Sequence, residues 1–177
     1  MKFGSWTYSG EQVDLVHINQ TNGSIPVYGT NGQIGWHDTA LCSKPGVIIG
    51  RKGAYRGVHF SGGPFYVIDT AFFMKFKKTI SSRWAYYTVA GYDIDSMDSG
   101  SAIPSTSRDD FGSILVVEPS YLIQSKFDEL LAPLWAKERA NISETETLVQ
   151  FRDFLLPKFM SGEIRVKQAE TIMAEVA

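Results

Sequence analysis

The sequence contains only one cysteine, Cys42, which cannot form a disulfide within the chain. Chains without disulfides are typical of reducing compartments. No stretch approaches the roughly 20 uninterrupted apolar residues that a membrane helix needs, and the N-terminal MKFGSWTYSG lacks the apolar core of a secretion signal. These absences predict a cytoplasmic protein that does not contact a membrane.

Motifs that mark common enzymes are also missing. The sequence has neither a Walker loop nor a G-x-G-x-x-G pattern, and it has no G-x-S-x-G nucleophile elbow. It also lacks the N/D-P-P-Y/F tetrad with which DNA amino-methyltransferases hold their target. One cysteine and three dispersed histidines, at His17, His37 and His59, give no zinc-ligand spacing. We therefore expect no catalytic residue, no metal and no cofactor in this chain.

The stretch YDIDSMDSGS carries three carboxylates, Asp93, Asp95 and Asp98. Oxygen-rich loops bind calcium, but an EF-type loop needs an oxygen donor at its fifth position, which Met97 occupies here. We interpret the stretch as a solvated turn. A small magnesium-dependent nuclease built on these carboxylates is an alternative function, although no nearby lysine completes such a site.

Positive charge is concentrated in one part of the sequence although the formal net charge is −2. Between Lys44 and Arg83 there are eight lysine or arginine residues and one acidic residue, Asp69, which gives this window a charge of +7. The charged residues that follow, as far as Glu118, are mainly acidic. This separation fits a polyanion bound on one surface, and it fits charges scattered over a solvated exterior equally well.

The residue pattern changes near Pro119. Before it, short runs of β-branched and aromatic residues alternate with turn sequences such as TNG, SKPG and SGGP. This pattern predicts a mostly β, mixed α+β domain over residues 1–118. Within it, residues 82–90 are predicted to form a short helix that turns Trp84, Tyr87 and Thr88 towards the core.

After Pro119 no glycine occurs before Gly162, and the sequence is rich in helix formers. We expect residues 119–177 to form a long helical arm with a short tail, kinked or broken near Pro133 or Pro157. Its apolar residues recur at three-four spacing on one stripe: Phe127, Leu131, Leu134, Leu148, Leu155 and Phe159. A domain of about 118 residues cannot bury such a stripe, which predicts a long helix from a second chain as its partner.

The segment GRKGAYRG has the composition of an anion-binding loop. Glycine lets a backbone approach phosphate closely, and Arg51, Lys52 and Arg56 add attraction. An arginine here can also contact guanine, while the amide of Asn31 or Gln33 suits adenine. Tyr55 offers a flat face beside them. These residues are predicted DNA contacts; the alternative is an exposed β-turn with no ligand, with the aromatic side chains in the core.

Six blocks of sequence follow one another in an order that matches a known family. They are SIPVYGTNGQIGWHD, GVIIGRKGAYRGVHFS, PFYVIDTAFF, RWAYY, DSGSAIPSTSRDDF and LVQFRDFLLPKFMSGEIRV, and they span about residues 24–166. In this order they resemble the specificity subunit of type I restriction-modification systems. Members of that family combine globular α/β target recognition domains with long helices, which form an antiparallel coiled coil and dock the modification subunits.

The resemblance implies a non-catalytic, sequence-specific DNA-binding subunit with one recognition domain and one helix, half of a usual member. Methyl transfer from S-adenosylmethionine, and any cleavage, would belong to partner subunits. Two copies joined through the helix would form a homodimer that reads a split palindromic target in double-stranded DNA. Hydroxyls and an arginine on a loop suit backbone anchoring, so further contacts are expected at Ser105, Thr106, Ser107 and Arg108.

Residues 1–22 depart from the family, whose members usually open with a tryptophan-containing segment and a glycine-rich strand. The stretch KFGSWTYSGEQVDL is instead similar, over about fourteen residues, to a peptide in the extracellular domain of nicotinic receptors. No Cys-loop or membrane span follows, and we interpret this similarity as coincidence. A second alternative function is therefore a truncated protein-interaction module that binds methyltransferase subunits without reading DNA.

Overall fold

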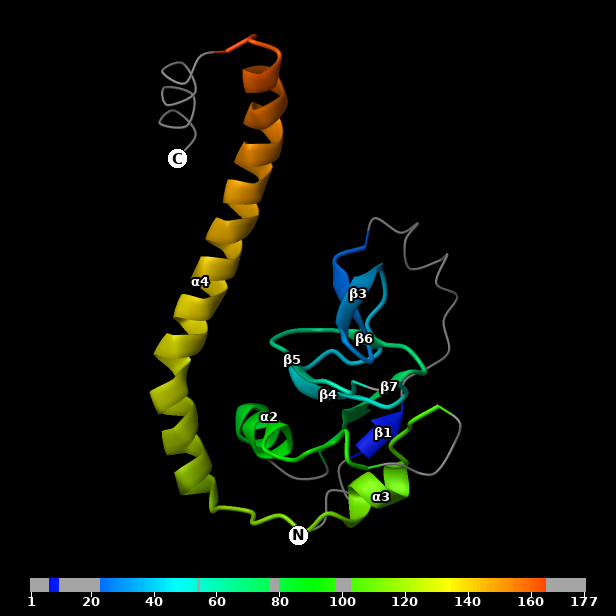
Figure 1. Ribbon diagram of the computed structural model, residues 1–177. Helices are drawn as coiled ribbons and strands as arrows, with labels where there is room; N and C mark the ends of the chain where they lie inside the picture. The colour runs from blue at the N-terminus through cyan, green and yellow to red at the C-terminus, as the bar shows by residue number, and fades with distance from the viewer. Residues whose placement is uncertain (1–6, 10–22, 54, 77–79, 98–102, 165–177) are drawn as a thin grey trace. The chain divides into compact units, whose positions relative to one another are not determined.

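The computed structural model describes residues 7–9, 23–53, 55–76, 80–97 and 103–164. The chain divides into two compact units, Met1–Asp128 and Glu129–Ala177. The first unit contains two small sheets with short helices, and the second is mainly one long helix (Figure 1). The predicted α+β class with a long helix is confirmed. The predicted tail lies outside the described residues from residue 165 onwards.

The larger sheet has the strand order β1-β7-β4-β5, in which every neighbouring pair is antiparallel. Its strands are β1 (Thr7–Ser9), β4 (Gly46–Gly50), β5 (Val58–Ser61) and β7 (Ala71–Met74). Strand β4 is buried on both faces, with Val47 and Ile49 in one core cluster and Ile48 in another. This position explains why its sequence, GVIIG, is apolar throughout and does not alternate.

The smaller sheet has the order β3-β2-β6, with β2 (Ile25–Gly29), β3 (Gly32–His37) and β6 (Tyr66–Val67). Strands β2 and β3 form an antiparallel hairpin, and β6 runs parallel to β2. Thr30 and Asn31 form the hairpin turn, and Gly32 follows them with a φ of 112°. Glycine adopts this left-handed conformation without a steric penalty, so it suits the position.

Helix α2 (Ser82–Ala90) has the bounds that the sequence predicts. It begins where the Ser81 hydroxyl accepts a hydrogen bond from the Trp84 main-chain nitrogen, at 3.0 Å. Its buried residues are Ala85 and Val89, which pack in the core cluster with β4. The predicted inward orientation of Tyr87 is wrong, because Ala85 and Val89 are the residues of α2 that face the core, and Tyr87 stays 46% exposed.

Helix α3 (Arg108–Ser113) is short, whereas α4 (Tyr121–Met160) has 40 residues and is roughly 60 Å long at 1.5 Å per residue. It continues through Pro133 and Pro157, so the helix is not broken at either proline, and the kink given as the other possibility stays a prediction. No helix among the described residues is long and apolar enough to cross a membrane.

The first two turns of α4 belong to the globular unit. Gln124 Oε1 accepts a hydrogen bond from the Ser81 main-chain nitrogen at 2.8 Å, and Asp128 Oδ1 accepts one from the Ser81 hydroxyl at 2.6 Å. The Phe127 ring lies edge to face against Tyr87, with centroids 5.8 Å apart. Phe127, predicted as part of the dimer stripe, therefore already contacts α2.

Candidate nucleic-acid interface

Three segments that are distant in sequence meet at one place on the globular unit. They are the β2–β3 turn, the residues that follow β4, and the residues that precede α3. The second and third are joined by a short antiparallel bridge between Lys52 and Ser105. The Gly53 main-chain nitrogen donates to the Pro104 carbonyl at 2.9 Å, and the Thr106 nitrogen donates to the Arg51 carbonyl, also at 2.9 Å. The sequence predicted DNA contacts in all three segments, and the structure brings these segments together.

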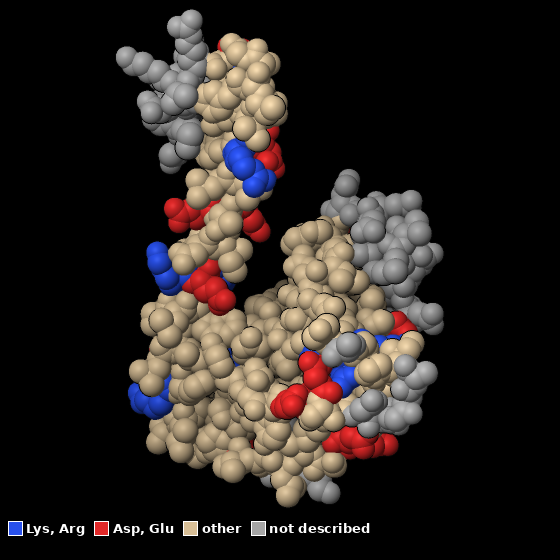
Figure 2. Space-filling view, viewed as in Figure 1, with Lys and Arg blue, Asp and Glu red and all other residues tan. Residues whose placement is uncertain are grey.

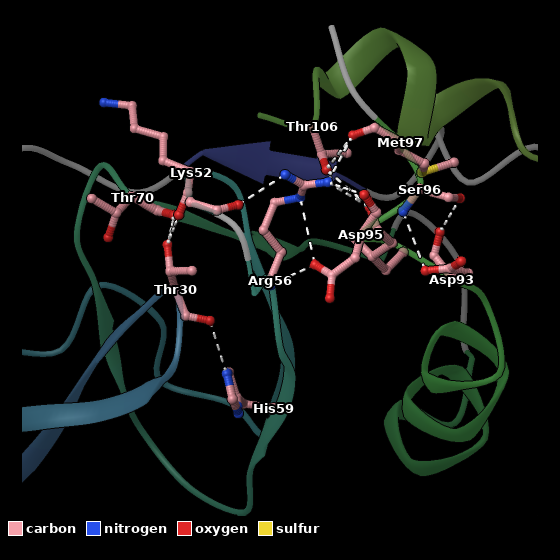
Figure 3. Close-up of polar contacts among 12 residues, drawn as sticks. Thr30, Lys52, Arg56, His59, Thr70, Asp93, Asp95, Ser96, Met97 and Thr106 are labelled. Carbon is pink, nitrogen blue, oxygen red and sulfur yellow. Dashed lines mark hydrogen bonds and ion pairs between the residues drawn. The ribbon is translucent and has the colours of Figure 1, made fainter. Parts of the chain in front are cut away.

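Thr30, in the hairpin turn, connects the first segment to the second (Figure 3). Its hydroxyl lies 2.8 Å from the Lys52 carbonyl oxygen and 2.7 Å from the Thr70 carbonyl oxygen. Its own carbonyl accepts a hydrogen bond from the Gly57 nitrogen at 3.2 Å and lies 3.1 Å from His59 Nε2. Gly50 passes so close that a β-carbon there would meet the Thr30 carbonyl oxygen at 2.6 Å. Nothing in the sequence distinguishes Thr30 as a residue of this site.

Most of the predicted contacts are accessible to a ligand. Tyr55 is 78% exposed. Arg51, Ser105 and Ser107 are partly exposed, and the remaining exposed members of the set are Asn31, Gln33, Lys52 and Arg108. Together these side chains combine amide groups, hydroxyls, cations and one aromatic face, which are the groups that contact phosphates and base edges in protein–DNA complexes.

Arg56 was predicted to contact DNA at the surface, but it is buried. The residue is only 4% exposed, and its guanidinium donates hydrogen bonds to main-chain carbonyls of the same unit. Figure 3 shows the group pointing towards the turn that carries Asp95 and Met97. Hydrogen bonds that involve a charged group contribute roughly 1.5–3 kcal/mol each, so this arginine is held firmly inside. It does not belong to the exposed set.

Thr106 is likewise internal, with 1% exposure, and it is not available to contact DNA as expected. Its neighbour Ser107 caps α3, because the Ser107 hydroxyl accepts a hydrogen bond from the Asp110 nitrogen at 3.0 Å. Arg108, the first residue of α3, is exposed beside Asp109.

The basic window of the sequence does not produce a uniformly positive surface. Arg56 is buried, and Lys52 Nζ forms an ion pair with Asp69 Oδ2 at 2.9 Å. On the face drawn in Figure 2, basic side chains of the globular unit lie next to acidic ones. Asp69 is a residue of this interface that sequence reasoning counted only as a charge. Its pairing with Lys52, 17 positions earlier, has no signal in the sequence.

The carboxylates of the YDIDSMDSGS stretch have local partners where they are described. Asp93 Oδ1 accepts a hydrogen bond from the Ser96 nitrogen at 3.2 Å, and Asp95 Oδ1 accepts one from the Arg56 nitrogen at 2.6 Å. Asp98 lies outside the described residues. Among the residues that are described, no group of three histidines, cysteines or acidic residues is arranged to hold a metal ion.

The predicted dimer stripe on α4 is exposed to different degrees. Leu134 and Leu148 are exposed, at 64% and 53%, and Leu131 and Phe159 are partly exposed. Leu155 is buried, at 7% exposure. Large apolar side chains open to solvent on a long helix are typical of a surface that another polypeptide covers.

Comparison with known proteins gives two unrelated likenesses, and no protein-family model matches the chain. One is to insect acetylcholine receptor subunits. The alpha-L1 subunit of Schistocerca gregaria is 80% identical over 20 residues, and the alpha-like 2 subunit of Drosophila melanogaster is 73% identical over 22. These matches cover 11% and 12% of this chain and 4% of each receptor subunit. A likeness this short shows no shared domain.

The other likeness is in three-dimensional structure. The S subunit of the type I restriction-modification system of M. genitalium aligns over 91% of this chain, with a TM-score of 0.71 and 14% sequence identity. The chain has the S-subunit fold. The HsdS subunit of Thermoanaerobacter tengcongensis aligns over 93% of the chain, with a TM-score of 0.50 and 11% identity. The chain covers 45% of each of these S subunits, so it spans about half their length.

Proposed function

We propose that this chain is the DNA-recognition component of a type I restriction-modification complex, without catalytic activity of its own. The globular unit reads one half of a split target in duplex DNA. The observation that carries the proposal is the convergence of the hairpin turn, the GRKG segment and the PSTS segment on a unit with the S-subunit fold. Methyl transfer and cleavage belong to partner subunits.

In this proposal, the exposed side chains of the three segments divide the work of binding. Arg51, Lys52 and Arg108 attract and position the phosphate backbone, while the amides of Asn31 and Gln33 reach base edges in the groove. The Gly53 nitrogen already bonds to Pro104, so it holds the loop and does not bind phosphate. Sequence preference then depends on where the loops place the amide groups.

Helix α4 supplies the second part of the proposed function, which is assembly. Its exposed stripe pairs with α4 of a second copy and docks modification subunits. Two copies related by a twofold axis present two identical reading units, so the expected target has two inverted halves separated by a fixed spacer.

The test is selection from a randomised duplex pool by the chain in complex with its modification subunit, at two salt concentrations. We expect an enriched motif with two inverted half-sites, and weaker binding at the higher salt. A stable complex that enriches no motif would overturn DNA reading. That result would favour the protein-interaction module, a function consistent with the internal use of Arg56 and the pairing of Lys52.

A further inference from the structure

The Arg56 guanidinium joins two loops of the globular unit from inside. Nη1 donates to the Gly53 carbonyl at 2.9 Å, within the GRKG segment. Nη2 lies within hydrogen-bonding distance of three carbonyls of the turn at residues 94–97, namely Ile94 at 3.1 Å, Asp95 at 2.6 Å and Met97 at 3.0 Å (Figure 3). One planar group therefore fixes the end of the GRKG segment against a turn about 40 residues further along the chain.

The PSTS segment is attached to the same turn. The Thr106 hydroxyl, from the PSTS segment, lies 3.3 Å from the Met97 carbonyl oxygen and 3.5 Å from the Ile94 carbonyl oxygen. A main-chain hydrogen bond then links Thr106 back to Arg51. The contacts form a closed circuit through the GRKG segment, the turn at 94–97 and the PSTS segment, with Arg56 and Thr106 buried within it.

The charge of Arg56 is matched locally. Asp95 Oδ1 accepts a hydrogen bond from the Arg56 main-chain nitrogen and lies 3.9 Å from Arg56 Nε. Nε has no hydrogen-bond partner, so this carboxylate is the group that compensates it. The arginine side chain itself has no exposed surface. A lysine would keep the charge but would lose the flat fork of donors that reaches carbonyls on both loops.

We propose that Arg56 is a positioning residue for DNA recognition. It never contacts DNA, and it sets the relative placement of the loops that carry Lys52, Tyr55 and Ser105, and thereby the sequence that the unit prefers. The inference rests on the proposed function. Cations at DNA interfaces usually neutralise phosphates as well as contributing to sequence preference. Arg56 contributes to target preference and neutralises no phosphate.

The experiment compares Arg56→Lys and Lys52→Ala with the parent, each in complex with the modification subunit. Affinities for the selected target and for an unrelated duplex are measured over a series of salt concentrations. For Arg56→Lys we expect a loss of about tenfold on the target, little change on the unrelated duplex, and an unchanged slope of log K against log salt. For Lys52→Ala we expect a similar loss on both duplexes and a slope smaller by about 0.9.

Thr106→Val is the second variant, because it removes one hydroxyl from the circuit and keeps Arg56 in place. It should also lose affinity for the target only and keep the salt slope, with a smaller loss than Arg56→Lys. If Arg56→Lys fails to fold, Thr106→Val is the variant that tests the proposal. Full target preference in whichever of the two variants folds, or a smaller salt slope in Arg56→Lys, would overturn the positioning role of Arg56. Either result would leave the proposed function standing. A parent complex without target preference would overturn the proposed function, and the role of Arg56 with it.

Discussion

Lys52 and Asp69 form an ion pair on the surface where the three loops meet, with Nζ and Oδ2 2.9 Å apart. Both side chains are about two-fifths exposed, at 42% and 40%. A phosphate that approaches Lys52 must therefore compete with a carboxylate that is already in place. In the proposed function, this competition weakens attachment to any DNA, whatever its sequence.

Asp69→Asn is accordingly expected to raise affinity for an unrelated duplex by about 1.4- to fivefold, since exposed ion pairs are worth roughly 0.2–1 kcal/mol. Affinity for the selected target should rise by a similar factor, so the preference for it should stay the same. Fluorescence anisotropy of the complex with labelled duplexes measures both. Asp153→Asn is the matched control, because Asp153 is also paired, with Arg152 at 2.7 Å, and it lies on α4. Equal gains in the two variants would show that only net charge had changed.

Gly50→Ala is expected to destabilise the globular unit by about 1–3 kcal/mol, because a β-carbon there would lie 2.6 Å from the Thr30 carbonyl oxygen. Backbone has to move to relieve that contact, and the hairpin turn moves with it. Urea unfolding followed by tryptophan fluorescence gives the free energy of unfolding. Gly63→Ala is the control, since nothing lies within 4 Å of a β-carbon at that position. Similar losses from both substitutions would contradict the close approach.

The pair Leu134→Glu and Leu148→Glu, made together, is expected to convert a dimer into a monomer. Both side chains are exposed on the stripe, and charges there oppose burial against a second helix. Light scattering at micromolar concentration reports the mass, which should be twice 19.7 kDa for the parent. Ser143→Glu adds the same charge 180° around the helix from Leu134 at 100° per residue, and should leave the mass unchanged. A monomeric parent would refute the pairing.

Tyr28 provides a test at high pH. Burial raises the pKa of its phenol above the ordinary value, and a hydrogen bond with Ser61 opposes that shift in part. Below a pH of about 10 the phenol is neutral in both folded and unfolded chains. Above it, the unfolded chain ionises more readily, so the free energy of unfolding falls as pH rises. Tyr28→Phe should lessen that fall between about pH 9.5 and 11 in urea unfolding, and parallel curves for parent and variant would contradict the shift.

The sequence predicted those features of the fold that depend on local pattern. The residue period of SSRWAYYTVA predicts α2, and the glycine-free stretch after Pro119 predicts α4. The orientation of Tyr87 was not predictable in this way. It depends on which face of α2 packs in the core, and Ala85 and Val89 are the residues that do so.

In the candidate site, too, local pattern predicts the position of some residues and not of others. Asn31, Lys52 and Tyr55 are exposed as expected, because turns project polar side chains outwards. Arg51, Lys52 and Arg56 read alike in the sequence, yet only Arg56 is buried. Its burial is determined by carbonyls of residues 94–97, about 40 positions away, which no local pattern specifies.

The bonds that hold the three loops together come from main-chain atoms and from the inward-facing Thr30, Arg56 and Thr106. The outward-facing side chains, such as Asn31 and Tyr55, take no part in them. If the surface reads DNA as proposed, replacement of these outer residues during evolution can change what it recognises while the loops keep their shape. Such a surface can acquire a new target by a few substitutions, without a new fold and without loss of stability.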